Sequence, residues 1–322
     1  MRLKILIFVL LLSFFSYGFE PIKPIPLSVP YNREKAELGK LLFHDPILSR
    51  DKTVSCASCH DLYTKWGTDH RNVSIGVEGK KGNVNAPSVY NSYFNFRLFW
   101  NGRAKNLKEQ AKGPLHNPVE MDMDKKTIEK RLKKIPVYKQ LFKKIYGDIR
   151  YEYVLDAIAE FEKALITPNS KFDKYLRCKE EGNKDCKKIL TKKELEGYIT
   201  FKKIGCISCH NGINVGGNSF QKLGVIFPYR WKPYYPDRYQ ITHKEEDKNV
   251  YRVPSLRNIE CTYPYFHDGS VKTLREALKK MSYHNLGFEL SDEEIDKIEA
   301  FLKTLTGKLP EIIRKDYENT KK

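Results

Sequence analysis

Long apolar runs are missing from this 322-residue sequence beyond its first fifteen residues. No later stretch is apolar enough to cross a bilayer, which needs about 20 such residues, so we expect a soluble mature chain. Alternating apolar and polar residues over the length of a strand are also missing, so we expect a mainly α-helical protein. Methionine is scarce, with residues only at positions 1, 121, 123 and 281.

The N-terminus has the composition of an export signal. Arg2 and Lys4 precede a run of eleven residues from Ile5 to Phe15, and small residues follow at positions 16 and 18. We assign residues 1–18 to a cleaved signal peptide and expect the mature protein in the periplasm. An uncleaved membrane tether is the alternative, but the run is shorter than the roughly 20 residues that span a bilayer.

Both halves of the chain contain a Cys-x-x-Cys-His motif. The two copies are Cys56, Cys59 and His60 in the first half, and Cys206, Cys209 and His210 in the second. Such a motif holds a haem covalently through two thioether bonds, and its histidine ligates the iron. One copy could arise by chance, but two copies indicate a protein with two c-type haems.

An internal repeat surrounds the two motifs. Amphipathic helices are predicted at 32–43 and 192–203, one before each motif. Each half also closes with a predicted helix, the first at 153–167 and the second beginning at Ser291, where Glu294 completes a capping box.

This repeat predicts two cytochrome c-type domains, at 19–167 and 168–322, each with one covalently bound haem. Long irregular loops are expected at 64–98 and 212–260, because these segments are rich in Gly, Asn, Pro and Tyr. The charged tail after Gly307 is expected either to fray or to pack loosely on the other domain.

The second ligand of each iron decides its chemistry, since a thioether sulfur gives an electron-transfer centre and an open position lets peroxide bind. Met281 lies 71 residues after His210 and just before the last helix, where a c-type domain usually supplies its sixth ligand. The first motif has no methionine at the corresponding place, so its iron is either open or ligated by a histidine. His70 and His116 are the candidates.

The segment 99–121 contains Trp100, Gln110 and Glu120. A carboxylate and an amide beside an open iron suit O–O cleavage, because the carboxylate moves a proton from the inner to the outer peroxide oxygen. On the residues alone, a solvated charge at a helix end is the simpler interpretation of Glu120.

Three cysteines lie outside the haem motifs. Cys178 and Cys186 flank a polar stretch, and an oxidising compartment would permit a disulfide between them. Cys261 then has no partner and is interpreted as a small apolar residue.

The formal charge of +18 comes from basic residues spread along the chain. This spread favours a solvated surface over a nucleic-acid site. Such a surface would also attract an acidic redox partner.

The sequence resembles the bacterial dihaem cytochrome c peroxidases over nearly its whole mature length. The resemblance rests on CASCH, NAPSVYN, FWNGRA, EQAKGPLHNPVEM, CISCH, VPSLRN and TYPYFHDGSVKTL. It implies that the N-terminal haem reduces hydrogen peroxide and that the C-terminal His/Met haem relays electrons from a donor. It also implies that Glu120 is the acid/base residue, Gln110 its pocket partner and Trp100 an electron bridge between the haems.

The same resemblance implies further partners. Members of the family hold a calcium ion between the domains, and Asn85, Thr262 and Pro264 match its protein ligands, the last two through their carbonyl groups. The resemblance also implies a small donor protein, either a cytochrome c or a copper protein, and a homodimer.

One position departs from the family pattern. Many members carry a mobile histidine in a Ser-Ile-Gly-His stretch that caps the peroxidatic haem until the other haem is reduced. Here the stretch is SIGVEGKKG, and Val77 cannot ligate iron. We therefore expect the first haem to be five-coordinate or water-bound when oxidised, unless His70 substitutes from a neighbouring loop.

Two other functions remain open. MauG-like proteins also leave the first haem open and oxidise a partner protein, but they use a tyrosine where this chain has Met281. A pure dihaem electron carrier would need both irons six-coordinate. The methionine favours the peroxidase.

Overall fold

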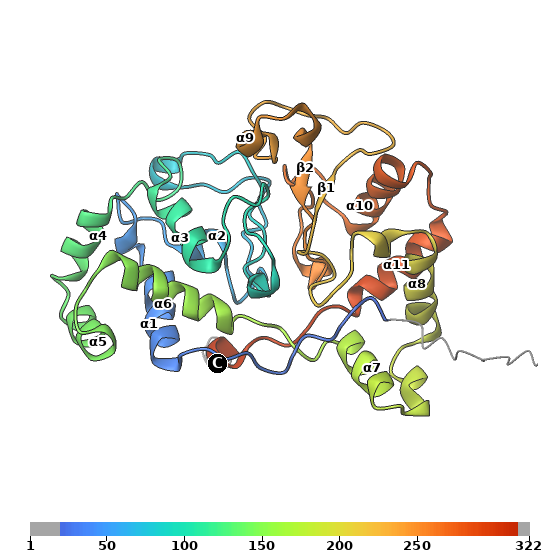
Figure 1. Cartoon of the computed structure of the whole chain (residues 1–322), viewed down its shortest axis with the longest axis horizontal. Helices are drawn as coiled ribbons and strands as arrows, with labels where there is room; N and C mark the ends of the chain where they lie inside the picture. The colour runs from blue at the N-terminus through green and yellow to red at the C-terminus, as the bar shows by residue number, and fades with distance from the viewer. Residues whose placement is uncertain (1–19, 315–322) are drawn as a thin grey trace, which may run out of the picture.

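The computed structural model describes residues 20–314 as a mainly helical protein with two lobes (Figure 1). The predicted signal at 1–18 lies outside the described residues. The first lobe contains α1 (Arg33–His44), α2 (Cys56–Cys59), α3 (Leu107–His116), α4 (Lys125–Leu132), α5 (Pro136–Tyr146) and α6 (Tyr151–Ala164). The second contains α7 (Lys171–Glu180), α8 (Lys192–Lys203), α9 (Tyr239–Thr242), α10 (Leu274–Met281) and α11 (Asp292–Lys303).

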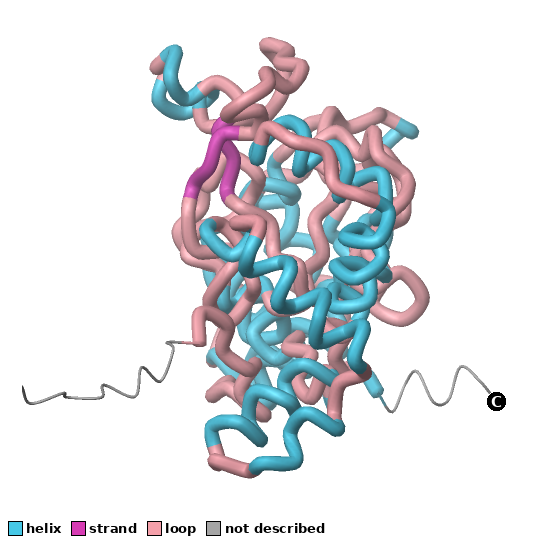
Figure 2. The backbone as a smooth tube through the Cα atoms, turned by 90° about the vertical axis from the view of Figure 1, so that its right-hand side faces the viewer, coloured by secondary structure: helices cyan, strands magenta, loops and turns pink. Residues whose placement is uncertain are grey.

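Sheet structure in the described part of the chain is limited to one short hairpin. Strands β1 (Phe220–Lys222) and β2 (Val250–Arg252) pair antiparallel, with Phe220 opposite Arg252. Figure 2 shows this hairpin in magenta among long loops. Within residues 20–314, no helix is both long and apolar enough to span a bilayer. The mainly α fold class is therefore confirmed.

Local sequence signals set the starts of the main helices. Thr191 caps α8 and Ser291 caps α11, and both form capping boxes with the glutamate three residues later. Asn32 caps α1, where its side chain accepts from the backbone N–H of Lys35 at 3.0 Å. These helices start where the sequence predicts them.

Each lobe is built on one pair of crossed helices that meet at a glycine. On α1, a Cβ added to Gly39 would lie 1.9 Å from the carbonyl oxygen of Ala157 on α6. On α8, a Cβ added to Gly197 would lie 1.9 Å from the carbonyl oxygen of Lys297 on α11. The same close approach in both lobes is the structural counterpart of the internal repeat, because only glycine lets the backbones pack so tightly.

The two ends of the chain cross to opposite lobes. Ile22 is buried in the core of the second lobe, and its segment forms a parallel bridge to Gly212. Ile313 is fully buried in the core of the first lobe, and the ammonium group of Lys40 on α1 donates to the Ile312 carbonyl at 2.8 Å. Of the two outcomes expected for the tail, residues 308–314 therefore show packing on the other lobe, and Figure 1 shows both crossings along its lower edge.

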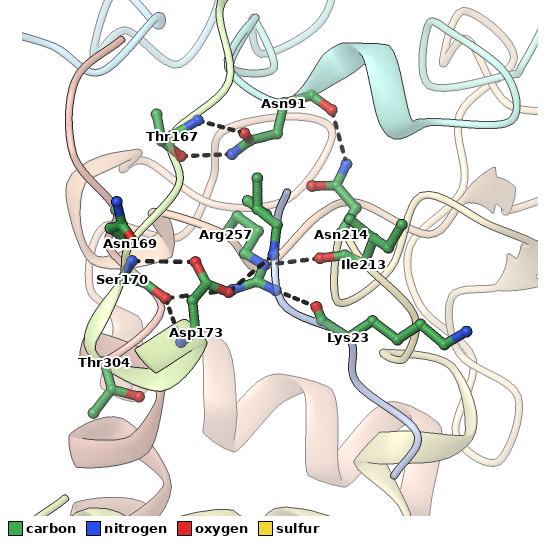
Figure 3. Close-up of polar contacts among 12 residues, drawn as sticks. Lys23, Asn91, Thr167, Asn169, Ser170, Asp173, Ile213, Asn214, Arg257 and Thr304 are labelled. Atoms are coloured by element: carbon green, nitrogen blue, oxygen red, sulfur yellow. Dashed lines mark hydrogen bonds and ion pairs between the residues drawn. The ribbon is translucent and has the colours of Figure 1, made fainter. Parts of the chain in front are cut away.

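Buried polar contacts join the two lobes to each other and to the N-terminal segment around Lys23 (Figure 3). Asn91 and Thr167 exchange two hydrogen bonds of 2.8 Å, and the amide of Asn214 donates to the Asn91 carbonyl at 3.2 Å. Beside them, Arg257 and Asp173 form an ion pair at 2.8 Å, with both side chains fully buried. Arg257 also donates to the carbonyl of Lys23 at 2.8 Å, so this ion pair anchors the N-terminal segment.

Candidate haem sites and active site

A large cavity in the second lobe brings together the residues predicted to hold the second haem. Cys206, Cys209 and His210 lie on its wall, and Met281 at the end of α10 lines it as well. The Nδ1 of His210 donates to the carbonyl of Val215 at 3.4 Å, which leaves Nε2 for a metal. Burial lowers the pKa of His210 to about 4, so the imidazole is neutral, as a ligand to iron must be.

The same cavity contains buried donors that lack a counter-charge. Arg252 is buried, and its guanidinium donates to the carbonyls of Phe99 and Val253, both at 3.3 Å, with no carboxylate of residues 20–314 paired with it. Both ring nitrogens of His267 and the hydroxyl of Tyr251 are buried without partners in the described part of the chain. Unpaired buried cations and donors are unfavourable unless an anion completes the site.

A haem fits this donor set. Its two propionates are carboxylates that would satisfy the guanidinium and the orphan donors, while the apolar wall would cover the ring. Burial lowers the pKa of Arg252 to about 10, and the group remains charged at neutral pH. Arg252 and His267 lie in or beside the sequence motifs but were not predicted as site residues, because a motif does not show which side chains are buried without a partner.

The first Cys-x-x-Cys-His motif forms the short helix α2 and the residue after it. The backbone N–H of His60 donates to the carbonyl of Cys56 at 3.0 Å, and its Nδ1 donates to the carbonyl of Gly67 at 3.0 Å. Burial lowers the pKa of His60 and raises that of Cys59 to about 11. A neutral imidazole with its Nε2 available and two uncharged thiols are the groups that covalent haem attachment requires.

Glu120 lies beside this first motif, in the turn that follows α3. Its negative charge contributes to raising the pKa of both Cys56 and Cys59, which places the carboxyl group on their side of the lobe. Burial raises the pKa of Glu120, opposed by a 2.6 Å hydrogen bond from Asn117 and by the charge of Arg103. The structure therefore places a carboxyl group with a raised pKa on the side of the lobe that holds the first motif.

Val77 and its loop pack directly on the Glu120 turn. The Val77 side chain is fully buried, and its backbone N–H donates to the Glu120 carbonyl at 2.8 Å. A Cβ added to Gly76 would lie 2.1 Å from the Val119 carbonyl oxygen, so the contact is close. The position of the family's mobile histidine is thus a packed aliphatic side chain.

The two histidines considered as ligands of the first iron are held elsewhere. His116 uses both ring nitrogens, with Nδ1 donating to the Met123 carbonyl at 2.6 Å and Nε2 accepting from the Tyr151 hydroxyl at 2.7 Å. His70 donates from Nε2 to the Cys261 carbonyl at 2.9 Å and stacks on Tyr263 with ring centroids 4.0 Å apart. His70 is thereby tied to the second lobe.

Trp100 lies at the boundary between the lobes. Its indole N–H donates to the Asn85 carbonyl at 2.9 Å, and its ring meets those of Tyr251 and His267 edge-on, with centroids 6.3 and 6.4 Å away. Trp100 also lines the cavity of the second site. Gln110 is half-buried on α3, the helix that leads to the Glu120 turn.

The three residues matched to calcium are found on the wall of the cavity that Trp100 also lines. Asn85, Thr262 and Pro264 all line the cavity of the second site. The Asn85 side-chain amide donates to the Arg71 carbonyl at 2.8 Å.

Comparisons with known proteins agree with this geometry. The family model for di-haem cytochrome c peroxidase matches residues 33–181, and a cytochrome c model matches residues 195–306. Cytochrome c551 peroxidase of Nitrosomonas europaea is 49% identical over 91% of this chain and 86% of its own length. The chain belongs to the dihaem cytochrome c peroxidase family. Cytochrome c551 peroxidase of Pseudomonas aeruginosa is 38% identical over 90% of this chain and 85% of its own length.

MauG proteins are more distant relatives of this peroxidase. The methylamine utilization protein MauG of Methylophilus methylotrophus is 31% identical over 88% of this chain and 86% of its own length. A MauG-like protein associated with microbial copper homeostasis has a similar solved structure, with a TM-score of 0.76 and 29% identity over 90% of this chain and 94% of that one. The family assignment and the two-haem composition are therefore confirmed, and the chain is an oxidoreductase that acts on peroxide with electrons from a donor.

The remaining cysteines of the peroxidase are also placed. Cys178 and Cys186 form the predicted disulfide, with their Cα atoms 5.6 Å apart. Cys261 is a free, half-buried thiol whose pKa burial raises to about 11. A raised pKa lowers the fraction of reactive thiolate at neutral pH.

Proposed function

We propose that the first site reduces hydrogen peroxide at an open iron and that Glu120 moves the proton. The observation that carries this is the half-buried Glu120 carboxyl group beside the first motif, next to a loop whose buried Val77 cannot ligate iron. The haem, when bound at His60, supplies the iron that binds peroxide and delivers electrons to it. The overall reaction consumes one peroxide, two electrons and two protons and gives two waters.

Glu120 acts on both peroxide oxygens. Its carboxylate accepts the proton of the inner oxygen and returns it to the outer one, so that water leaves instead of hydroxide. Asn117 holds the carboxyl group by its 2.6 Å hydrogen bond, and Gln110 on α3 orients the bound peroxide. The Val77 loop covers the turn and limits water at the site.

The second site relays the electrons. His210 and Met281 would hold the iron of the second haem, and Trp100, which lines the same cavity, would lie on the route between the sites. A methionine ligand supports a conventional electron-accepting centre. Thus Met281 favours peroxide reduction over the protein oxidation of MauG-like enzymes.

Replacing Glu120 with Gln tests the proton transfer. The variant keeps the size of the side chain but cannot accept a proton, so the rate of reaction with peroxide should fall by about 10²–10⁴-fold. Stopped-flow mixing of holoprotein with peroxide measures this rate. Glu152→Gln, an exposed change on α6, is the matched control. An unchanged rate in Glu120→Gln would remove this residue from the mechanism.

The ligation of the first iron has its own test. The fully oxidised holoprotein, equilibrated at room temperature and pH 7, should show a high-spin haem in electron paramagnetic resonance. Full activity should need no prior reduction of the protein. Val77→His should convert the spectrum toward low spin and make activity depend on reduction of the second haem. Two purely low-spin haems in the unaltered protein would contradict the proposal.

Four finer assignments belong to the same proposal. Asn85, Thr262 and Pro264 bind calcium between the lobes, so a chelator should lower activity and added calcium should restore it. The mature protein is periplasmic, which fractionation tests. Its electron donor is a small cytochrome c or copper protein, which turnover assays with each donor test. The enzyme is a homodimer, which sedimentation tests.

A further inference from the structure

A row of aromatic side chains leads from the wall of the second haem cavity to the surface. Tyr251 and His267 both line the cavity, and their rings stack with centroids 4.4 Å apart. The ring of Tyr235 meets that of His267 edge-on at 4.4 Å, and the ring of Tyr234 lies 5.2 Å from that of Tyr235. Centroid distances of this size are those of packed aromatic pairs, so the row is continuous. We call Tyr251, Tyr235 and Tyr234 the tyrosine row.

The two ends of the tyrosine row differ in their surroundings. At the inner end, the ring of Tyr251 lies 6.3 Å from that of Trp100, the residue proposed to bridge the two haem sites. Tyr235 in the middle is 3% exposed, whereas Tyr234 at the outer end is 53% exposed. The row therefore branches from the proposed electron route and ends in solvent.

A base lies beside the buried tyrosine of the row. The Tyr235 hydroxyl donates to an Asp268 carboxylate oxygen at 3.4 Å, and Arg230 pairs with the same oxygen at 2.7 Å. Burial opposes the ionisation of Asp268, but hydrogen bonds from Arg230 and Ser270 hold its pKa below the ordinary value. A tyrosine that loses an electron must also release its phenolic proton, and an adjacent carboxylate accepts it. Tyr235 therefore has the proton acceptor that its oxidation requires.

Polar contacts fix the outer end of the row. The side-chain amide of Asn83 donates to the Tyr234 carbonyl at 2.9 Å, and the Lys232 ammonium group donates to the Tyr234 hydroxyl at 2.8 Å. The backbone N–H of Tyr235 donates to the Lys232 carbonyl at 3.0 Å. The exposed phenol is thus held at a fixed distance from the buried one, and about half of it is open to a small molecule in solution.

We propose that the tyrosine row is a second outlet for the oxidising power of peroxide, at which Tyr234 oxidises small phenols by one electron. This inference rests on the proposed function, because peroxide reduction at the haem sites supplies the oxidant. Phenols are the substrate class that fits, since they share the redox chemistry of tyrosine and need contact with only one exposed ring.

Each step balances in electrons and protons. An electron passes from Tyr234 through Tyr235 to the second site, while Tyr235 lends its proton to Asp268 and takes it back. The Tyr234 proton passes to solvent, and a neutral tyrosyl radical remains. A phenol then gives this radical one electron and one proton, which restores Tyr234. Two such cycles supply the two electrons and two protons that peroxide needs, so one peroxide and two phenols give two waters and two phenoxyl radicals.

Trapping the radical tests the row without measuring turnover. Holoenzyme is mixed with peroxide and the spin trap 2-methyl-2-nitrosopropane in the absence of a donor, and mass spectrometry of the peptides identifies the labelled residue. The adduct should form on Tyr234, and Tyr235→Phe should remove most of it. Tyr93 on the first lobe and Tyr263 on the second are 39% and 45% exposed and serve as internal controls. An adduct of equal yield on either control would overturn the proposal.

Steady-state peroxide reduction with guaiacol and with reduced cytochrome c separates the possible failures. Tyr234→Phe and Tyr235→Phe should lose most of the guaiacol activity and keep the cytochrome c activity, whereas the control Tyr93→Phe should keep both. Tyr234 is exposed, so its variant tests the row even where Tyr235→Phe is less stable. Undiminished guaiacol activity in Tyr234→Phe would refute the outlet alone. Failure of the unaltered enzyme to consume peroxide with either reductant would overturn the proposed function and this inference with it.

Discussion

Glu162 on α6 is a buried acid without a partner, and its protonation should set how stability depends on pH. Its Oε2 has no hydrogen-bond partner within residues 20–314, and burial raises its pKa from 4.5 to about 8. It lies near Cys56, whose thiol pKa its charge helps to raise. We predict that Glu162→Gln stabilises the protein at neutral pH.

The direction follows from the protons bound in each state. Below pH 4.5 the carboxyl group is protonated in both the folded and the unfolded chain, and it imposes no penalty. Between pH 4.5 and about 8 it is ionised only in the unfolded chain, so folding takes up a proton and stability falls as pH rises. Each pH unit costs about 1.4 kcal/mol, so the penalty is about 3 kcal/mol at pH 7 and about 5 kcal/mol above pH 8.

Urea unfolding of the holoprotein at pH 4, 5.5 and 7 provides the measurement. The Glu162→Gln variant should match the unaltered protein at pH 4 and exceed it by about 3 kcal/mol at pH 7. Glu152→Gln on the same helix is exposed and should show no such trend. A difference between Glu162→Gln and the unaltered protein that stays constant from pH 4 to 7 would refute the assignment of a buried, protonated carboxyl group.

Three further predictions concern the packing of the lobes. Asp173→Asn leaves the buried Arg257 guanidinium without its counter-charge and should lower the free energy of unfolding by about 3–5 kcal/mol, whereas loss of less than 1 kcal/mol in urea unfolding would contradict a buried pair. Gly39→Ala places a methyl group 1.9 Å from a carbonyl oxygen of α6 and should cost about 1–3 kcal/mol, visible as a lower thermal midpoint; an unchanged midpoint would exclude this tight crossing. Replacing both Cys178 and Cys186 with Ser should lower the free energy of unfolding by about 2–3 kcal/mol. The variant and the unaltered protein should be equally stable once the disulfide of the unaltered protein is reduced.

The features that the sequence predicted well have local causes. The starts of α8 and α11 depend on Thr191 and Ser291 and on glutamates three residues later, all within one turn. The haem motifs are equally local, and the polar loop between Cys178 and Cys186 permits their disulfide. The hairpin of β1 and β2 was not predicted, because strands of three residues leave no recognisable alternation.

The features that were missed depend on contacts between distant segments. Arg252 is buried next to residues from the first lobe, and its lack of a carboxylate partner exists only in the folded chain. In the sequence, Glu162 is one of several acidic residues on an amphipathic helix, and only the packing of the folded chain shows that it is buried. The Glu120 assignment lies between these cases, since the family resemblance pointed to the residue and the structure shows that partial burial raises its pKa.

The crossing of the chain ends has a consequence for the order in which the molecule is completed. Ile22 is among the earliest described residues to leave the ribosome, yet the core that buries it is built from residues 172–305. The core around α1 and α6 is incomplete until Ile313 has been synthesised. Each half therefore needs a segment from the other half to complete its core. If the chain were cut between α6 and α7, each fragment would keep a terminal segment that packs on the other fragment and would lack the segment that completes its own core.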